Sequence, residues 1–295
     1  MRVATFQTTS SLLQKTMTTQ AKLAEVQAQQ SSGLKSTDYG GLGASAGKVV
    51  DLNVSVSRAE ANISAAKTVI SRSDMAASVL QDITDILTNA RSAVSGTSSS
   101  DQLDTLKQNA AEYLEDLKLM VNTQYQGRYL FSGSMTDTAP VDLSAYSATD
   151  LTTVNTDYYQ GDSYIQSIRL DNGQQMNYGT TATIDGIEQA FRALSYVANG
   201  NLTDTSELAD VDALLVGAQD GIIAATSKAG STSSRLQSYI QNEEDFIAEA
   251  KEMAKDETSI DVAEAAILAT SYETQLEASF SALSKIINLK LVDYL

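Results

Sequence analysis

Carboxylates are the side chains with which this sequence could do chemistry. The chain has no cysteine and no histidine, so it lacks a thiolate nucleophile, a zinc–sulfur site and the commonest general base. Its densest carboxylate groups are Glu243-Glu244-Asp245 and Asp256-Glu257. Adjacent residues point around a helix rather than into one site, so both groups predict a solvated helix face. A glycosidase that uses two such carboxylates remains an alternative.

A glycine-rich stretch, Gly41-Leu-Gly43-Ala-Ser-Ala46, imitates the phosphate-binding turn of dinucleotide-binding proteins. That motif requires a strand before it, and the sequence predicts none there. We therefore interpret residues 31–47 as a loop. We expect no cofactor and no metal in this chain.

Charge and hydropathy argue against further classes of function. The formal net charge is −17, which leaves no excess of Lys and Arg for nucleic-acid phosphates. No run of about 18 apolar residues predicts a membrane span, and the N-terminus has no apolar signal-peptide core. Pro140 is the one proline, so long uninterrupted helices are allowed almost everywhere.

The last 36 residues, from Ile260 to Leu295, predict a long amphipathic helix. Large apolar residues recur there every three or four positions, without proline or glycine. Such a stripe is rarely stable in water unless something covers it. The stripe consists of Leu268, Tyr272, Leu276, Phe280, Leu283, Ile287, Leu291 and Tyr294.

Residues 1–32 predict a second amphipathic helix with a weaker stripe, which the C-terminal stripe could cover. Its apolar face is Phe6, Leu13, Met17, Ala21 and Ala24, flanked by Leu12, Leu23 and Val26.

The middle of the chain predicts further helices around a β-rich insert over residues 128–183. Within the insert, GRYLFSG (127–133) favours a strand, and Asn172-Gly173 suits the type I′ turn of a hairpin. A capping-box-like start from Asp185 to Glu188 opens the helix that follows, and Thr258 with Asp261 could cap the last one. The predicted helices span roughly 49–94, 103–121, 185–198 and 208–253.

The fold class is therefore mainly α with a β insert: a long antiparallel helical rod or bundle, built from paired N- and C-terminal halves, with a small β-rich outer domain.

Three stretches carry a resemblance to a known family. They are MRVATFQ with the SSGLK turn (1–35), QYQGRYLFSGSMTDTAPV (124–141) with YYQGDS (158–163), and the ending over 261–295. The chain resembles the flagellin family, and within it the hook-associated proteins of the hook–filament junction. The last residues, Asp293-Tyr294-Leu295, are more similar to the ends of the hook-associated proteins than to the ends of filament flagellins. The glycine-rich run at 39–43 departs from the family pattern, so the geometry of 33–50 does not follow from the resemblance.

The resemblance implies a structural subunit rather than an enzyme, placed in the extracellular flagellum. Export would use the flagellar type III pathway without a cleaved signal peptide, with residues 1–30 carrying the signal. Partners would be copies of the chain, neighbouring hook-associated protein and flagellin subunits, and an export chaperone. The implied assembly interface is Phe6, Leu13, Met17, Leu268, Tyr272, Leu276, Phe280, Leu283, Ile287, Leu291, Tyr294 and Leu295.

The resemblance also implies a division into three parts. These are terminal helices for assembly in the inner layer, a helical rod, and the β-rich insert, formed by 1–40 with 261–295, 41–127 with 184–260, and 128–183. Filament flagellin proper is the main alternative, followed by an intracellular coiled-coil scaffold or receptor signalling domain and the glycosidase.

Overall fold

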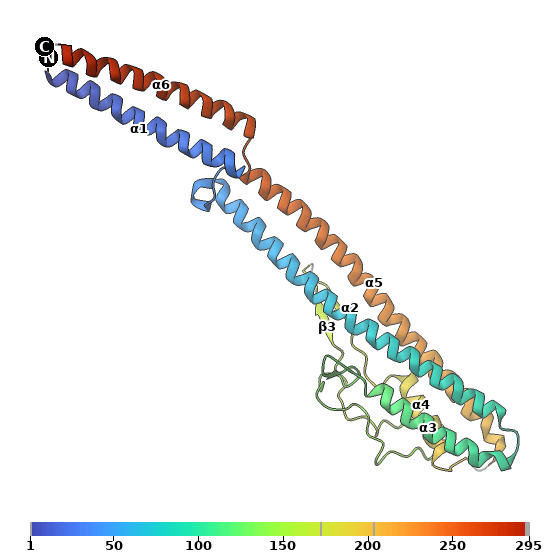
Figure 1. Cartoon of the computed structure of the whole chain (residues 1–295). Helices are drawn as coiled ribbons and strands as arrows, with labels where there is room; N and C mark the ends of the chain where they lie inside the picture. Colours follow the sequence, from blue (N-terminus) through green and yellow to red (C-terminus); the bar gives the residue numbers. More distant parts are fainter. Residues whose placement is uncertain (1, 172, 203, 293–295) are drawn as a thin grey trace. The chain divides into compact units, whose positions relative to one another are not determined.

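The computed structural model describes residues 2–171, 173–202 and 204–292, with side-chain surroundings from residue 7 to residue 286. Six helices carry most of this part of the chain, and short antiparallel strand pairs complete it (Figure 1). The predicted fold class, mainly α with a β insert, is confirmed. The helices are α1 (Arg2–Ser32), α2 (Ser45–Gly96), α3 (Leu103–Val121), α4 (Asp185–Ala198), α5 (Leu208–Thr258) and α6 (Val262–Val292).

Short 3₁₀ turns, Tyr39–Leu42, Ser100–Gln102 and Thr205–Glu207, precede α2, α3 and α5. The first of them covers only Gly41 and Leu42 of the glycine-rich stretch, because Ser45 and Ala46 already belong to α2. The element before it is α1 rather than a strand. The predicted loop over 31–47 is therefore limited to residues 33–44. Within the described residues, no helix is both long and apolar enough to cross a membrane.

The chain divides into two compact units: residues 1–59 with 245–295, and residues 60–244. Both α2 and α5 contribute to each unit. The three-part division implied by the resemblance is finer than this and stays a prediction.

In the unit of residues 60–244, α2 and α5 run antiparallel and α4 lies in the core with α3 beside it. Arg91 of α2 donates from Nε to Asp212 Oδ1 of α5 at 2.9 Å. Residues 186–188 and 190–197 of α4 are all buried. Glycines allow α4 to approach α5 closely, because a Cβ on Gly186 would lie 2.6 Å from the backbone nitrogen of Ile222.

The insert contains far less strand than its composition predicts. Two pairs are formed, β1 (Gln124–Tyr125) with β2 (Arg128–Tyr129) and β3 (Ser167–Arg169) with β4 (Gln175–Asn177). The predicted strand over 127–133 is thus limited to two residues. Most of the insert is irregular chain.

The predicted hairpin exists as β3 and β4, but its turn differs from the prediction. The Gly173 amide donates to the carbonyl of Leu170 at 2.9 Å, and Gly173 has φ 80°. Gly173 therefore closes a four-residue turn that begins at Leu170, instead of occupying its centre. Asn172 lies outside the described residues.

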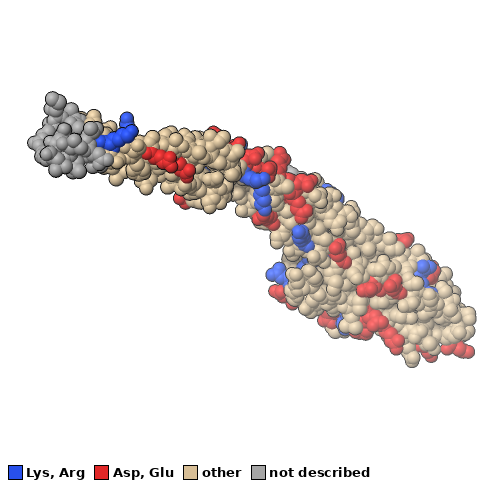
Figure 2. All heavy atoms as spheres, turned by 45° about the horizontal axis from the view of Figure 1, so that its top comes forward, with Lys and Arg blue, Asp and Glu red and all other residues tan. Residues whose placement is uncertain are grey.

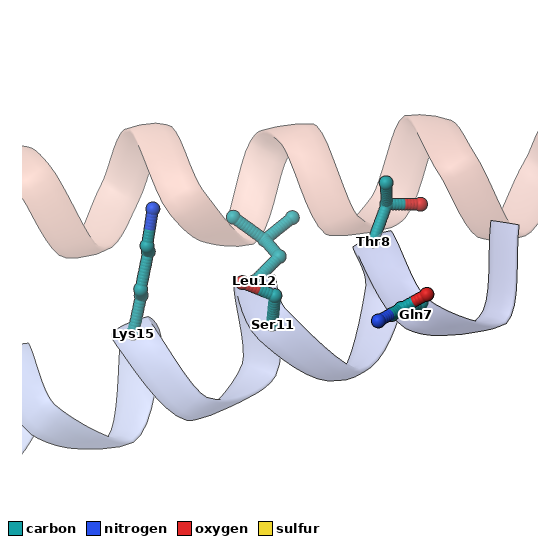
Figure 3. A pocket seen from close by; sticks show the side chains of 5 residues that line it. All are labelled: Gln7, Thr8, Ser11, Leu12 and Lys15. Carbon is teal, nitrogen blue, oxygen red and sulfur yellow. The ribbon is translucent and has the colours of Figure 1, made fainter. Parts of the chain in front are cut away.

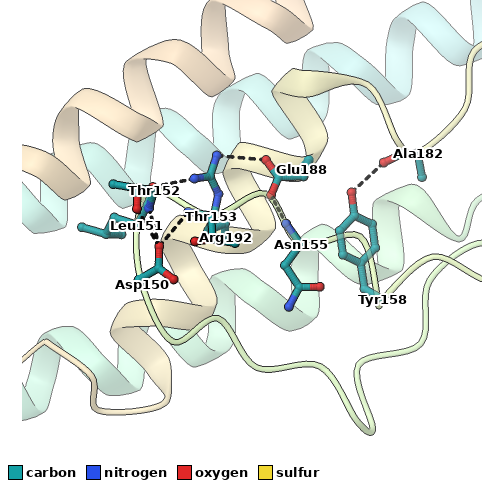
Figure 4. Close-up of polar contacts among 9 residues, drawn as sticks. All are labelled: Asp150, Leu151, Thr152, Thr153, Asn155, Tyr158, Ala182, Glu188 and Arg192. Atoms are coloured by element: carbon teal, nitrogen blue, oxygen red, sulfur yellow. Dashed lines mark hydrogen bonds and ion pairs between the residues drawn. The ribbon is translucent and has the colours of Figure 1, made fainter.

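Polar contacts fix the irregular insert to α4 (Figure 4). Glu188 Oε2 accepts from Arg192 Nη2 at 3.0 Å, and its Oε1 accepts from the Asn155 amide at 2.9 Å. Arg192 Nη1 donates to the carbonyl of Leu151. The expected capping role of Glu188 is therefore wrong, because its carboxylate is used by this buried network.

An aromatic cluster lies next to this network. The rings of Tyr158 and Phe191 are 4.5 Å apart between centroids, and Tyr146 meets Tyr158 edge-on at 5.2 Å. The Tyr158 hydroxyl donates to the carbonyl of Ala182 at 2.8 Å. Burial raises the pKa of Tyr158 and of Tyr146 well above the usual range, so both phenols stay neutral.

Asp261 alone caps the last helix. Its Oδ1 accepts from the amides of Ala263 at 2.8 Å and Glu264 at 3.2 Å. Thr258 instead ends α5, where its hydroxyl donates to the carbonyl of Ala254 at 2.9 Å.

Candidate assembly surface

The terminal helices α1 and α6 pack against each other antiparallel, so the start of α1 lies beside the end of α6 (Figure 1). We call this pair the terminal coil. On α1 the covered positions follow steps of three and four: Thr9, Leu12, Thr16, Thr19, Leu23 and Val26. On α6 they follow the same alternation: Ala265, Ala269, Tyr272, Leu276, Ser279, Leu283 and Ile286. A 3.5-residue repeat on both helices is the pattern of a coiled coil.

The coil is packed best near the connectors that join it to α2 and α5. Val26 is buried there with Ala265 and Ala269, and Leu23 and Tyr272 pack against them. A weak polar contact supports this end, from Gln27 Nε2 to Glu273 Oε1 at 3.5 Å. Small alanines opposite Val26 allow the two helices to approach closely.

Elsewhere the α1 side of the contact is unusually polar. Thr16 is 3 % exposed. Its hydroxyl finds a hydrogen-bond partner within the same helix, because it donates to the carbonyl of Leu12 at 2.9 Å. Thr9 and Thr19 occupy equivalent positions of the repeat. Threonine contributes less apolar area than leucine, so the coil gains modest stability from its contact face.

The prediction that the N-terminal stripe contacts α6 is wrong. Leu13 is 46 % exposed and Met17 is 62 % exposed. Each of them follows a covered residue by one position, which turns the side chain by about 100° around the helix. The larger side chains suggested the wrong face, because the face that meets α6 carries threonines.

The C-terminal stripe divides into two faces. Tyr272, Leu276 and Leu283 are turned toward α1, whereas Leu268 is 40 % exposed and Phe280 is 55 % exposed. Steps of four residues advance by about 400°, so a stripe built from them drifts by roughly 40° per step around the helix. A single partner helix therefore cannot cover all of it.

The terminal coil leaves several large apolar side chains exposed, on more than one side of its two helices. We call them together its outer apolar surface. Two of its members, Val262 at 51 % and Ile267 at 71 % exposed, were not singled out in the sequence, although each is a large apolar residue beside the stripe. The face of the coil visible in Figure 2 carries few charged side chains. The described members of the outer apolar surface are Leu13, Met17, Val262, Ile267, Leu268 and Phe280.

The remaining predicted interface residues lie outside the described side chains. Phe6, Ile287 and Leu291 belong to α1 and α6 by backbone only, and Tyr294 and Leu295 are outside the described chain. Their part in assembly stays a prediction.

A shallow hollow lies on α1 close to the beginning of the described side chains (Figure 3). Thr8, Leu12 and Lys15 extend from α1 toward α6, and Gln7 and Ser11 lie beside them. Apart from Leu12, the described residues that line it are polar.

The carboxylate groups Glu243-Glu244-Asp245 and Asp256-Glu257 are spread around α5. Glu244 lies 3.9 Å from Lys67 Nζ in an exposed ion pair, and Asp256 is exposed. Glu257 instead accepts from Lys48 Nζ and from Ser45 Oγ, each at 2.7 Å. These two donors hold the pKa of Glu257 below its usual value of 4.5. Among the described residues, no cluster of three or more acidic side chains is arranged to hold a metal ion.

Comparison with known proteins agrees with this architecture. Residues 3–136 match the family model of the bacterial flagellin N-terminal helical region, which extends from α1 into the start of the insert. No curated protein matches the sequence.

Solved structures extend the likeness to most of the chain. The crystal structure of FlgL from Bacillus cereus is similar with a TM-score of 0.54 and 18 % identity, over 69 % of this chain and 96 % of that one. A flagellar hook-associated protein of Vibrio parahaemolyticus is similar with the same score and identity, over 75 % and 99 %. Residues 3–136 thus match a bacterial flagellin N-terminal helical region, which confirms the resemblance to the flagellin family, and the chain's fold is similar to that of hook-associated flagellar proteins.

Proposed function

We propose that this chain is a structural subunit of the bacterial flagellum that joins the hook to the filament. The observation that carries the proposal is the terminal coil, whose first helix belongs to the matched flagellin region and whose outer apolar surface has no cover within the described chain. This number of exposed large apolar side chains on one helix pair favours an interaction site. The activity of the chain is assembly, and it needs no catalytic group.

Assembly would bury the outer apolar surface against neighbouring subunits. Fully burying one large apolar side chain contributes roughly 1.5–3 kcal/mol, and less when it is already half covered. The six described residues would together contribute on the order of 5–10 kcal/mol before the costs of association. Different surfaces meet on neighbouring subunits of a helical tube, so the contact would be heterologous.

The partners follow from the same proposal. They are copies of the chain, a hook-associated protein on one side, flagellin on the other, and an export chaperone before assembly. The chain would reach the extracellular flagellum through the flagellar type III pathway, with residues 1–30 carrying the export signal.

Deletion of the gene in its own organism tests the proposal. We expect electron microscopy to show hooks without filaments, and flagellin to be shed into the medium. The full chain should restore filaments, whereas a chain that lacks residues 261–295 should not. Normal filaments in the deletion strain would contradict the proposal. Filament flagellin would be the better assignment if the purified chain formed long filaments without other flagellar proteins.

A further inference from the structure

Two connectors join the terminal coil to α2 and α5, and they are hydrogen-bonded to each other. The Lys35 amide donates to the carbonyl of Thr258 at 2.7 Å, and the Ile260 amide donates to the carbonyl of Gly33 at 3.0 Å. Leu34 and Ser259 form an isolated antiparallel bridge between them. The chain leaves and re-enters the coil through one small paired segment.

Side chains strengthen this segment from the connector. The Lys35 ammonium donates to the carbonyl of Glu257 at 2.8 Å and reaches the carbonyl of Asp256 at 3.5 Å. Both carbonyls belong to the last turn of α5, where backbone oxygens lack helical partners and a cation is favoured. Lys35 therefore ties the first connector to the end of α5.

The first turn of α2 holds the same helix end from another direction. Glu257 places one carboxylate oxygen on Lys48 Nζ and the other on Ser45 Oγ, both at 2.7 Å. A carboxylate that accepts charge-assisted bonds at this distance is well positioned by its donors. Three parts of the chain thus meet at Glu257: the connector after α1, the start of α2 and the end of α5.

We propose that Lys35, Ser45, Lys48 and Glu257 form a latch that fastens the terminal coil to the ends of α2 and α5. Releasing the Glu257 side chain removes the tie between the start of α2 and the end of α5. The paired connectors next to it then open more often, and the coil can move more freely. The division of the chain agrees with this role. The compact unit that contains the coil also contains α2 as far as Ala59 and α5 from Asp245, so it continues through the connectors instead of ending at them.

Hydrogen exchange of the full chain, followed by mass spectrometry, tests the latch. Glu257→Ala and Lys48→Met should each speed exchange in peptides covering 33–36 and 258–262 by roughly three-fold, the scale of a lost exposed ion pair. Peptides of α4 should be unchanged, because that helix is buried in the other unit's core.

The matched control is Glu252→Ala. Glu252 pairs with Lys255 at 3.2 Å within α5, and both side chains are exposed, so this variant removes a carboxylate near the latch without opening it. Exchanging the charges, Lys48→Glu with Glu257→Lys, should restore slow exchange. The latch is refuted if Glu257→Ala resembles the control, if exchange also rises in α4, or if the exchanged pair behaves like the single variants.

Discussion

Two charged side chains, Glu188 and Arg192, are buried in the described chain, at 3 % and 5 % exposed. They lie one turn apart on α4, and together they bind the backbone of the insert at Leu151 and Asn155. A buried pair adds little stability over apolar residues of the same size, yet breaking it leaves a charge in an apolar interior. The main effect of the Glu188–Arg192 pair is to fix the position of an otherwise irregular segment of the insert.

Arg192→Met should therefore lower the free energy of unfolding of this unit by about 3–5 kcal/mol, because the Glu188 carboxylate is left buried without its cation. Urea unfolding followed by circular dichroism measures the loss. The double variant Glu188→Gln with Arg192→Met should recover part of it, since no charge then remains buried. A single variant within about 1 kcal/mol of the parent protein would contradict this account.

A second residue-scale prediction concerns Gly186. A methyl group there would lie 2.6 Å from the Ile222 nitrogen and 2.7 Å from the Ala218 carbonyl oxygen, and backbone atoms cannot yield easily. Gly186→Ala should lower the free energy of unfolding by about 1–3 kcal/mol. Gly230→Ala in α5 is the control, because its Cβ meets nothing within 4 Å, and it should raise stability by up to about 1 kcal/mol. Equal effects of the two changes would show that close helix approach is not the cause.

Asp150 gives the insert a defined response to acid. Its carboxylate accepts from the amides of Thr153 at 2.6 Å and Thr152 at 2.8 Å, and these bonds lower its pKa to about 2 from the ordinary 3.8. Since the folded pKa is depressed, the stabilisation is complete above 3.8 and is lost as the pH falls through about 2.

The Thr153 amide resonance, followed by NMR through an acid titration, should therefore shift with a midpoint near 2. Asp150→Ala should lack that step, and a midpoint at 3.8 or above would rule out the proposed hydrogen bonding.

At the scale of elements, the sequence predicts where the helices lie better than it predicts their contact faces. Apolar spacing, glycine and polar turns place all six helices close to their observed bounds. The face of α1 was missed because its contact positions include Thr9, Thr16 and Thr19, while larger apolar side chains lie one residue further on. Periodicity alone ranks the larger residues first.

The insert was predicted less well for a different physical reason. Its Asp, Asn, Ser and Thr side chains can accept hydrogen bonds from nearby backbone amides, and such bonds compete with those of a β-ladder. Asp142, Asn155 and Asp162 each accept from the amide two residues later, at 2.9, 2.9 and 3.1 Å. These local bonds turn the chain where a longer β-ladder was expected. The buried Glu188–Arg192 pair could have been anticipated only from its i, i+4 spacing, which is equally common on exposed helices.

The division of the C-terminal stripe into two faces yields an element-scale prediction. Leu276 is 8 % exposed against α1, so Leu276→Ala should destabilise the terminal coil by about 2 kcal/mol or more. Phe280 is 55 % exposed, and Phe280→Ala should change coil stability by less than about 0.5 kcal/mol. Hydrogen exchange of α1 peptides measures both. Equal destabilisation would mean that α1 covers the whole stripe.

At the scale of the whole molecule, helices from the two halves of the sequence share one coil, which covers some of its apolar residues and leaves others exposed. The inner face uses small and polar residues such as Thr16, Ala265 and Ala269, and several large apolar residues remain outside. If the coil contributed only to the folding of a single chain, burying Met17 and Phe280 would stabilise it more than leaving them exposed. This distribution is what the proposed assembly requires.

Replacing an outer residue by a charge should therefore separate assembly from folding. Met17→Asp and Phe280→Asp place a carboxylate on the surface that neighbours would cover, where its desolvation is costly. We expect each variant to be exported and folded, as shown by unchanged circular dichroism and exchange in α4, yet to restore few or no filaments in the deletion strain. Val154→Asp is the control, because Val154 is 68 % exposed on the insert and outside the coil. Full restoration by both coil variants would show that the outer apolar surface is not buried in the flagellum, whereas failure of the control alone would place the contact on the insert.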